Sequence, residues 1–148
     1  SAAPPPPPRR SGVSIRTLFR RAAGRRDTVV VVRDGAGWRF GVFQPAPIRC
    51  QRDYYGTGES FVFSLGAGDP ADGIRTHRWS RRNSMFALSS VDGGLLFGGG
   101  GKPALWVDAD FVHGASGRCS TFEDSECLAA SESFECIHLE VWAIVSPP

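Results

Sequence analysis

Five side chains of this sequence carry groups that enzymes use: Glu59, Asp108, Asp110, His113 and Cys119. Two carboxylates near a histidine can act as general acid and base, or can bind a divalent cation. A cysteine with a depressed pKa can act as a sacrificial thiol towards peroxide. These groups define one hypothesis, a small redox or metal-dependent enzyme that uses Cys119 or the set Glu59, Asp108, Asp110 and His113.

The sequence contains no second sign of catalysis. It has no Gly-x-Ser-x-Gly elbow and no His-Glu-x-x-His helix, and only Arg118 stands close to Cys119 as a cation that could activate the thiol. Aspartates beside glycines at strand ends usually accept hydrogen bonds from turn amides. We therefore interpret these residues as structural, expect no catalytic residue, cofactor or metal, and keep the enzyme as the alternative.

A tract of four glycines, Gly98 to Gly101, follows the short apolar run Leu95 to Phe97. A phosphate-binding loop needs a helix after the glycines and, in the Walker form, a Ser or Thr after the lysine. Here Lys102 is followed by Pro103 and then by residues typical of a strand, 104–108. The pattern therefore predicts a tight connection between two packed strands and no nucleotide site.

The cysteines do not form a recognisable metal or disulfide pattern. No Cys-x-x-Cys pair and no zinc-finger spacing occurs among Cys50, Cys119, Cys127 and Cys136. Nothing in the sequence resembles a secretory signal, so we interpret these residues as reduced thiols of a cytosolic protein. A metal site built from the last three cysteines with His113 or His138 is left open as an alternative.

Length and charge limit the classes of function. A chain of 148 residues with a net charge of +2 fits one domain. No long uncharged apolar run is present, which argues against membrane insertion.

The charges are distributed unevenly: arginines gather before residue 34 and acids gather after residue 103. The arginines are not interleaved with aromatic residues as in a nucleic-acid surface, so we expect no nucleic-acid partner. The first 26 residues lack acids and mimic a transit peptide, so a mitochondrial or nuclear location is the alternative to the cytoplasm.

The start of the chain predicts a tail, a helix and a hairpin. Residues 1–11 are rich in Pro and Arg, which predicts a disordered tail. Apolar residues at helical spacing predict a helix that starts at Ser11 or Ser14 and ends at Gly24, with one buried face formed by Ile15, Leu18, Phe19 and Ala22. The β-branched run 28–32 predicts a central strand buried on both faces, and 38–43 is its hairpin partner across the turn 34–37.

The rest of the chain predicts further short strands at 60–65, 76–80, 85–89, 95–97, 104–108 and 134–145. We expect 111–124 to be irregular and 126–133 to hold a helical turn. In the last strand Ile137, Leu139, Val141 and Ala143 should face one way. The predicted fold is mainly β (α+β): two antiparallel sheets packed as a β-sandwich, with one clear helix and short helical turns. The predicted domain covers 12–145, with 146–148 as a trailing segment.

Several motifs together resemble the TLDc domain of the oxidation-resistance proteins. In order they are 54–63 (Tyr-Tyr-Gly-Thr-Gly-Glu-Ser-Phe-Val-Phe), Trp79 with 83–86 (Asn-Ser-Met-Phe), 97–101, 105–110 (Leu-Trp-Val-Asp-Ala-Asp), 114–116, 119–122 (Cys-Ser-Thr-Phe) and 140–142 (Glu-Val-Trp). Upstream, 12–21 and 40–43 fit the same domain, so the resemblance runs from about Gly12 to Ile144.

The resemblance implies a β-sandwich, protection against oxidative stress and no established catalytic activity. It also implies a protein partner, the cytosolic sector of the vacuolar-type proton-pumping ATPase, to which several family members bind. Family members normally have a further helix and strand before the region of Gly12, where this sequence has the Pro-rich segment. We therefore expect an N-terminally truncated domain with an unpaired sheet edge.

The resemblance also singles out residues for partner binding or structure. Our hypothesis is that the loops at the glycine-lined end, with Asp108, Asp110 and Ser116, form the recognition surface. Glu59 and Glu140 lie in or beside apolar strands, so each is either hydrogen-bonded to backbone amides or exposed for a partner. The full set of signature residues comprises Gly56, Gly58, Glu59, Gly98, Gly99, Gly100, Gly101, Trp106, Asp108, Asp110, Gly114, Ser116, Cys119, Phe122, Glu140 and Trp142.

Overall fold

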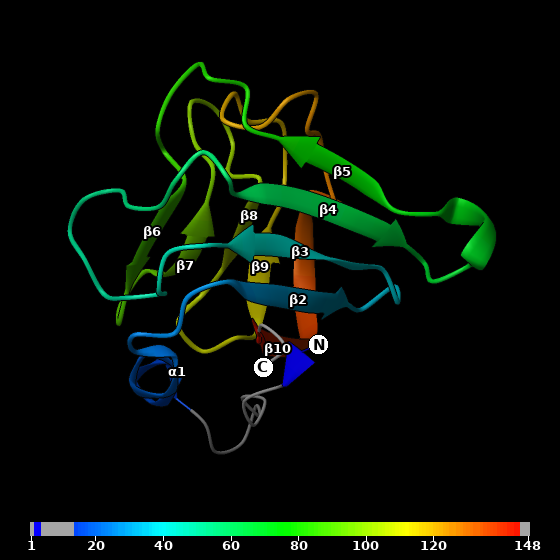
Figure 1. Cartoon of the computed structure of the whole chain (residues 1–148). Coiled ribbons are helices and arrows are strands. Elements are labelled where there is room, and N and C mark those ends of the chain that lie inside the picture. The colour runs from blue at the N-terminus through cyan, green and yellow to red at the C-terminus, as the bar shows by residue number, and fades with distance from the viewer. Residues whose placement is uncertain (1, 4–13, 146–148) are drawn as a thin grey trace.

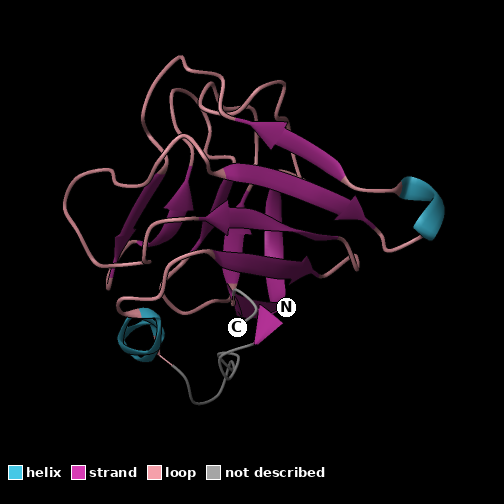
Figure 2. Cartoon of the chain, in the orientation of Figure 1, coloured by secondary structure: helices cyan, strands magenta, loops and turns pink. Residues whose placement is uncertain are grey.

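The structure, a computed structural model, describes residues 2–3 and 14–145 of the chain. The described part is mainly β, with one α-helix and one large antiparallel sheet (Figures 1 and 2). Ala2–Ala3 form a short strand, β1, which pairs with Ile144 and Ala143. The rest of the expected N-terminal tail, the first residues of the expected domain and the segment 146–148 lie outside the described residues.

The helices and strands follow the chain in a simple order. Before the sheet proper comes α1 (Ile15–Ala22), and the strands that follow are β2 (Thr28–Asp34), β3 (Arg39–Gln44), β4 (Phe61–Gly66) and β5 (Arg75–Arg78), with a 3-10 turn η1 (Pro70–Asp72) between the last two. The second series is β6 (Ala87–Ser90), β7 (Gly94–Phe97), β8 (Leu105–Val107), β9 (His113–Ala115) and β10 (Ser133–Ile144). Their order in the sheet is β5-β4-β3-β2-β10-β9-β8-β7-β6.

The long strand β10 explains why the sheet is continuous where the sequence predicted two sheets. Its first residues, Ser133 to Glu135, pair with β9, and its remainder pairs with β2. A bulge between Cys136 and His138 separates the two parts. In Figure 1 the strands β2 to β5 run across the view, whereas β6 to β9 run roughly up and down behind them. One strand therefore joins two groups of strands that point in different directions.

The bulge also changes which residues of β10 point inward. Phe134 and Cys136 are buried before it, and Leu139, Val141 and Ala143 are buried after it. Ile137 lies at the bulge and is only half-buried. The predicted alternation was right for the second part of the strand and wrong at Ile137, because a bulge shifts the side-chain phase by one residue.

The helix α1 forms as its spacing predicts. Ser14 is the N-cap, and its Oγ accepts a hydrogen bond from the Thr17 backbone N–H at 3.3 Å. Ile15, Leu18 and Ala22 are buried. Arg20 and Arg21 lie in the last turn, where a positive charge interacts favourably with the helix dipole and stabilises the helix. The predicted apolar face is confirmed for Ile15, Leu18 and Ala22, whereas Phe19 is only half-buried. In Figure 1 the helix lies below the strands and does not cover a face of the sheet.

The strand β2 is central, as predicted, but it is not buried on both faces. Val30 and Val32 are buried, whereas Val29 and Val31 are half-exposed. The neighbouring strands alternate in the same way, with Val42 and Val62 in the core. No described helix or loop covers the other side of these strands in Figure 1. A β-branched run alone does not distinguish these two environments.

Two segments between β8 and β10 differ from the prediction. A short strand, β9, occurs within 111–124, where irregular chain was expected. The segment 126–133 contains no helical turn. Its backbone is held instead by distant side chains: the Leu128 N–H donates to Ser116 Oγ at 2.8 Å, and the Ala130 N–H donates to Asp34 Oδ2 at 3.0 Å. These non-local hydrogen bonds favour an extended loop over a helix.

One cluster of buried side chains forms the core, and both groups of strands contribute to it. Phe40 of β3 and Phe134 of β10 meet edge to face, with ring centroids 5.0 Å apart. Leu95, Phe97, Leu105 and Val107 enter from β7 and β8. No helix in the described part of the chain is long and apolar enough to cross a membrane.

Candidate functional site

The glycine tract lies at the end of the molecule that is uppermost in Figure 1, where it connects β7 to β8. It runs beside the segment 118–121 and is fixed to it by hydrogen bonds. The Gly99 N–H donates to Thr121 Oγ1 at 2.9 Å, and the Gly99 carbonyl accepts from the Ser120 N–H at 3.0 Å. The Lys102 N–H donates to the Arg118 carbonyl at 3.0 Å. The tract is therefore a packed connection, as predicted.

Gly100 shows why this connection needs glycine. Its φ of +73° lies in the left-handed region, where a side chain is unfavourable. A Cβ on Gly100 would also stand 2.0 Å from Ser120 Oγ, which is closer than any contact allows. Both the backbone conformation and the neighbouring serine exclude a larger residue without rearrangement.

Asn83 links the glycine tract to the rest of this end. Its Oδ1 accepts hydrogen bonds from Thr121 Oγ1 at 2.7 Å and from the Met85 N–H at 3.0 Å. Its Nδ2 donates to Ser120 Oγ at 2.9 Å, and its backbone carbonyl accepts from Trp79 Nε1 at 2.8 Å. We did not single out Asn83 from the sequence, although it stood in one of the motifs of the resemblance. An asparagine between strands is common in turns, so its type gave no signal.

Gly56, Gly58 and Glu59 belong to the same end. A Cβ on Gly58 would stand 2.2 Å from the ring of Trp79, so this glycine makes room for the indole. Trp79 in turn meets Phe86 with ring centroids 5.3 Å apart. The side chain of Glu59 is exposed, which fits the second of the two roles considered for it, availability to a partner. The predicted glycines are therefore packing residues.

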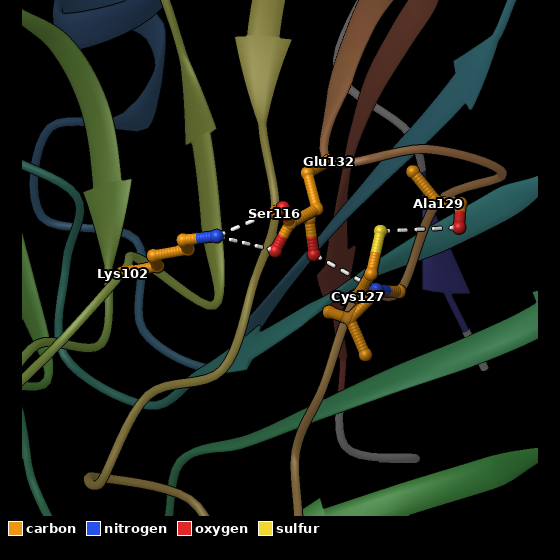
Figure 3. Close-up of polar contacts among 6 residues, drawn as sticks. Lys102, Ser116, Cys127, Ala129 and Glu132 are labelled. Atoms are coloured by element: carbon orange, nitrogen blue, oxygen red, sulfur yellow. Dashed lines mark hydrogen bonds and ion pairs between the residues drawn. The ribbon is translucent and has the colours of Figure 1, made fainter.

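Ser116 and Cys127 lie next to each other, with Ala129 and Glu132 around them (Figure 3). Ser116 is buried; its Oγ donates to the Ala104 carbonyl at 2.6 Å and accepts from the Leu128 N–H. Cys127 donates to the Ala129 carbonyl at 3.3 Å, and burial raises the pKa of its thiol. Cys119 is buried with its Sγ 3.3 Å from Ser125 Oγ. These groups hold loops in place and offer little to an external ligand.

A second predicted group lies at the opposite end of β8. Asp108 Oδ1 accepts from the Val112 N–H at 2.9 Å, and Asp108 Oδ2 is 3.7 Å from His113 Nδ1. Asp110 is exposed in the same turn. Because β8 begins near the glycine tract and ends at Asp108, the structure separates Asp108 and Asp110 from the glycine-lined end. The hypothesis that placed them on one surface with the tract needs that correction, and Ser116 is too buried to belong to it.

Trp106 and Gly114 support the strand pairing around that turn. Trp106 Nε1 donates to the Gly93 carbonyl at 2.8 Å. Gly114 lies opposite Val107, and a Cβ there would stand 2.3 Å from the Trp106 carbonyl oxygen. Phe122 is buried in the core and bridges to Trp79. All three are structural residues in this arrangement.

Glu140 and Trp142 lie in a third place, on the outer side of β10. Glu140 accepts hydrogen bonds from His138 Nε2 and from Trp142 Nε1, both at 2.8 Å. The hydrogen bond from His138 is the largest cause of the lowered pKa of Glu140. The carboxylate is hydrogen-bonded, but its partners are these two side chains and not the backbone amides that the sequence suggested.

The proposed catalytic groups do not converge. Glu59 lies in the loop before β4, whereas Asp108, Asp110 and His113 lie around the turn between β8 and β9. Among residues 2–3 and 14–145 no three His, Cys, Asp or Glu side chains gather so that they could hold a metal ion. The four cysteines form no disulfide among the described residues, and of these only Cys50 is exposed.

Comparisons with known proteins agree with the motifs. A family model described as the TLDc domain matches residues 8–145. Nuclear receptor coactivator 7 of Homo sapiens is 37% identical over 133 residues, which is 89% of this chain and 14% of that protein. Oxidation resistance protein 1 of Bos taurus is 34% identical over 136 residues, 91% of this chain and 15% of that protein. The chain therefore spans only a small part of the length of these relatives.

Proposed function

We propose, from the premise that this chain belongs to the TLDc domain family, that it is a non-catalytic protein-interaction module of the oxidative-stress response. The name of one group of relatives, oxidation resistance protein 1, supports the cellular role. The dispersal of the candidate catalytic groups over separate loops supports a binding role over turnover. The single core that the two groups of strands share supports the β-sandwich that the family resemblance implies.

The proposed partner is the cytosolic sector of the vacuolar-type proton-pumping ATPase, as the family resemblance suggests. Binding there requires that the domain be exposed to the cytoplasm. The proposed contact surface is the glycine-tract end, redefined by the structure as the loops 54–59, 81–84, 98–102 and 118–124. Its exposed side chains include Tyr54, Glu59, Arg82 and Arg118.

One observation supports the glycine-tract end as the contact surface: hydrogen bonds hold its loops in place without a partner. Asn83, Ser120 and Thr121 join three of the loops through hydrogen bonds between 2.7 and 3.0 Å. Loops that are ordered before binding lose less conformational entropy in the complex. A rigid scaffold that presents exposed loops is the usual arrangement of a recognition site.

Charge reversal on exposed side chains tests the proposal best. Gly99→Glu would be a poor variant, because Gly99 is buried and a Cβ there would stand 2.7 Å from Met85 Sδ. Arg82→Glu and Arg118→Glu change exposed residues of these loops, and Arg26→Glu is the matched control beside α1. Purified cytosolic sector should be captured about tenfold less well by each loop variant than by wild type or the control. Equal capture by all four proteins, or by none, would overturn the proposed surface.

A further inference from the structure

The outer side of β2, β3 and β4 carries apolar side chains where an antiparallel sheet usually carries polar ones. In register across the sheet lie Trp142 of β10, Val29 of β2, Phe43 of β3 and Phe61 of β4. Val31, Phe63 and Leu65 lie on the same side. All of these residues are half-buried and none belongs to the core cluster. We call this surface the outer face; it consists of Val29, Val31, Phe43, Phe61, Phe63, Leu65 and Trp142.

The aromatic residues of the outer face are packed against one another. Phe43 and Phe61 have ring centroids 5.3 Å apart, and Phe61 and Phe63 have centroids 6.4 Å apart. Gly41 leaves room for Phe63, because a Cβ on Gly41 would stand 2.9 Å from its ring. The rings therefore form a shallow, preformed apolar surface. A continuous apolar surface on a protein commonly marks an interaction site.

Two depressions at one end of the outer face meet at Arg39. The first, of about 150 Å³, is lined by Val31, Arg33, Arg39, His138 and Glu140. The second, of about 300 Å³, is lined by Arg39 and Leu65 together with residues of the β4–β5 connection, among them Ile74. Ile74 is 67% exposed, the largest fraction among the large apolar side chains of the described residues. Each depression thus combines apolar walls with the Arg39 guanidinium and one carboxylate, Glu140 in the first and Asp69 in the second.

Three arginines stand around the outer face, beside the carboxylates of Glu140 and Asp69 that line the same depressions. Arg33 and Arg39 are exposed at this end, and Arg78 lies over the Phe61 ring at 5.8 Å on the other. In the described part of the chain no carboxylate lies within ion-pair distance of these three arginines. The Glu140 carboxylate already accepts from His138 and Trp142. Arg39 interacts electrostatically with the Glu140 carboxylate but forms no ion pair with it, so its guanidinium can still pair with a carboxylate of a ligand.

We infer that the outer face binds an acidic amphipathic α-helix of a protein partner. Aliphatic side chains of the helix would cover the Phe43, Phe61 and Phe63 rings, and carboxylates on its flanks would pair with Arg33, Arg39 and Arg78. A helix is the element that covers a sheet face, since a strand would add at an edge. Crossing from β10 to β4 takes roughly 15 Å, or about 10 helical residues. This surface goes beyond the proposed function, since it is separate from the glycine-tract loops.

Three labelled peptides of about 18 residues can test the inference by fluorescence anisotropy with the full chain. The first has leucines on one helical face and glutamates on the flanks. The second has lysines in place of the glutamates, and the third has serines in place of the leucines. The acidic amphipathic peptide should bind saturably, and each of the others should bind about tenfold more weakly or worse. Equal binding of the acidic and basic peptides would overturn the inference.

Variants of the chain locate the peptide. Arg39→Glu changes an exposed residue and should weaken binding of the acidic peptide about tenfold, whereas Arg26→Glu should leave it unchanged. Phe61→Ser should weaken binding as well, with circular dichroism checking its fold; if it fails to fold, Arg39→Glu still decides. Unaltered binding by Arg39→Glu would overturn the inference. Binding to phosphatidylserine vesicles without the peptide, lost in Arg39→Glu, would indicate a membrane surface and would also overturn the inference. Self-association of the chain through the outer face would overturn it as well.

Discussion

Glu140 is the residue whose charge is most clearly tied to its neighbours. The pKa of this carboxyl is lowered, first because His138 donates a hydrogen bond to it and further because Trp142 does. A carboxyl with a lowered pKa in the folded state stabilises the fold above its unfolded pKa, and this contribution is lost as the pH falls through the folded value. Glu140→Gln should therefore lower the free energy of unfolding near pH 6 by about 0.5 kcal/mol, a small effect because the site is partly solvated.

The difference between wild type and Glu140→Gln should shrink as the pH is lowered below the ordinary value of 4.5. Urea unfolding at several pH values measures it, and Glu132→Gln, at an exposed carboxylate paired with Lys102, controls for general charge effects. A constant difference across this pH range would show that the hydrogen bonds do not depend on the charge of Glu140.

The cysteines should differ strongly in reactivity, although their sequence contexts look alike. Cys50 is exposed, Cys119 and Cys136 are buried, and burial raises the pKa of Cys127. Because the thiolate is the reactive form, iodoacetamide at about pH 8 should label Cys50 first and Cys127 about tenfold more slowly or worse. Peptide mass spectrometry resolves the four sites, and all should react alike in concentrated guanidinium chloride. Labelling of native Cys119 as fast as Cys50 would restore the thiol-enzyme hypothesis.

At the scale of single elements, the connection between β7 and β8 depends on contacts as well as on backbone freedom. Gly100 and Gly37 both have positive φ, +73° and +86°, but a Cβ on Gly37 would meet nothing within 4 Å. Gly37→Ala should therefore lower the free energy of unfolding by about 1 kcal/mol, the cost of placing a side chain on a residue with positive φ. Gly100→Ala should cost about 3 kcal/mol, since it also forces Ser120 to move.

A double-mutant cycle with Ser120→Ala separates the two contributions to the cost of Gly100→Ala. If the Ser120 hydroxyl causes the extra cost, Gly100→Ala should cost less in the Ser120→Ala background than in the wild type. Chemical denaturation of the four proteins gives the comparison. Equal costs for Gly37→Ala and Gly100→Ala in the wild type would mean that the serine rotates away freely and that this contact does not explain the glycine.

The elements that could be predicted are those whose signal is local. The spacing of Ile15, Leu18 and Ala22, with a cap at Ser11 or Ser14, predicted α1. The glycine tract predicted a connection between strands. β9 has only three residues, too few to show a period, and its pairing with β10 is non-local. The segment 126–133 looks helical by itself, but Ser116 and Asp34, far away in the sequence, hold its backbone.

The candidate site shows the same limit. Motif order indicated which glycines matter, and the structure places Gly56, Gly58 and the tract at one end. The order of the motifs could not indicate that Asp108 and Asp110 lie at the other end, because the length and direction of β8 determine their position. Asn83 became visible only through its hydrogen bonds to Ser120 and Thr121. Spatial convergence depends on register and strand direction, which residue types alone do not define.

At the scale of the whole molecule, β10 belongs to both groups of strands, and this arrangement affects where partners can bind. One group of strands uses both of its faces, with Val30, Val42 and Val62 in the core and Val29, Phe43 and Phe61 on the outer face. The glycine-tract loops lie at one end of the strands and do not cover the outer face. The domain therefore offers two surfaces of different chemistry, one of loops and one of apolar rings flanked by arginines, that could be occupied at the same time.

Sharing of β10 also predicts that the whole domain unfolds in one step. Val42 in β3 and Leu105 in β8 are fully buried and belong to the same core cluster, so replacing either by Ala should lower the free energy of unfolding by about 2–4 kcal/mol. Fluorine NMR of 5-fluorotryptophan protein reports Trp38, beside β3, and Trp106, in β8, separately. Each substitution should shift both unfolding transitions equally. If Leu105→Ala moved only the Trp106 transition, the two groups of strands would be separate cooperative units, and β10 would be a linker between them.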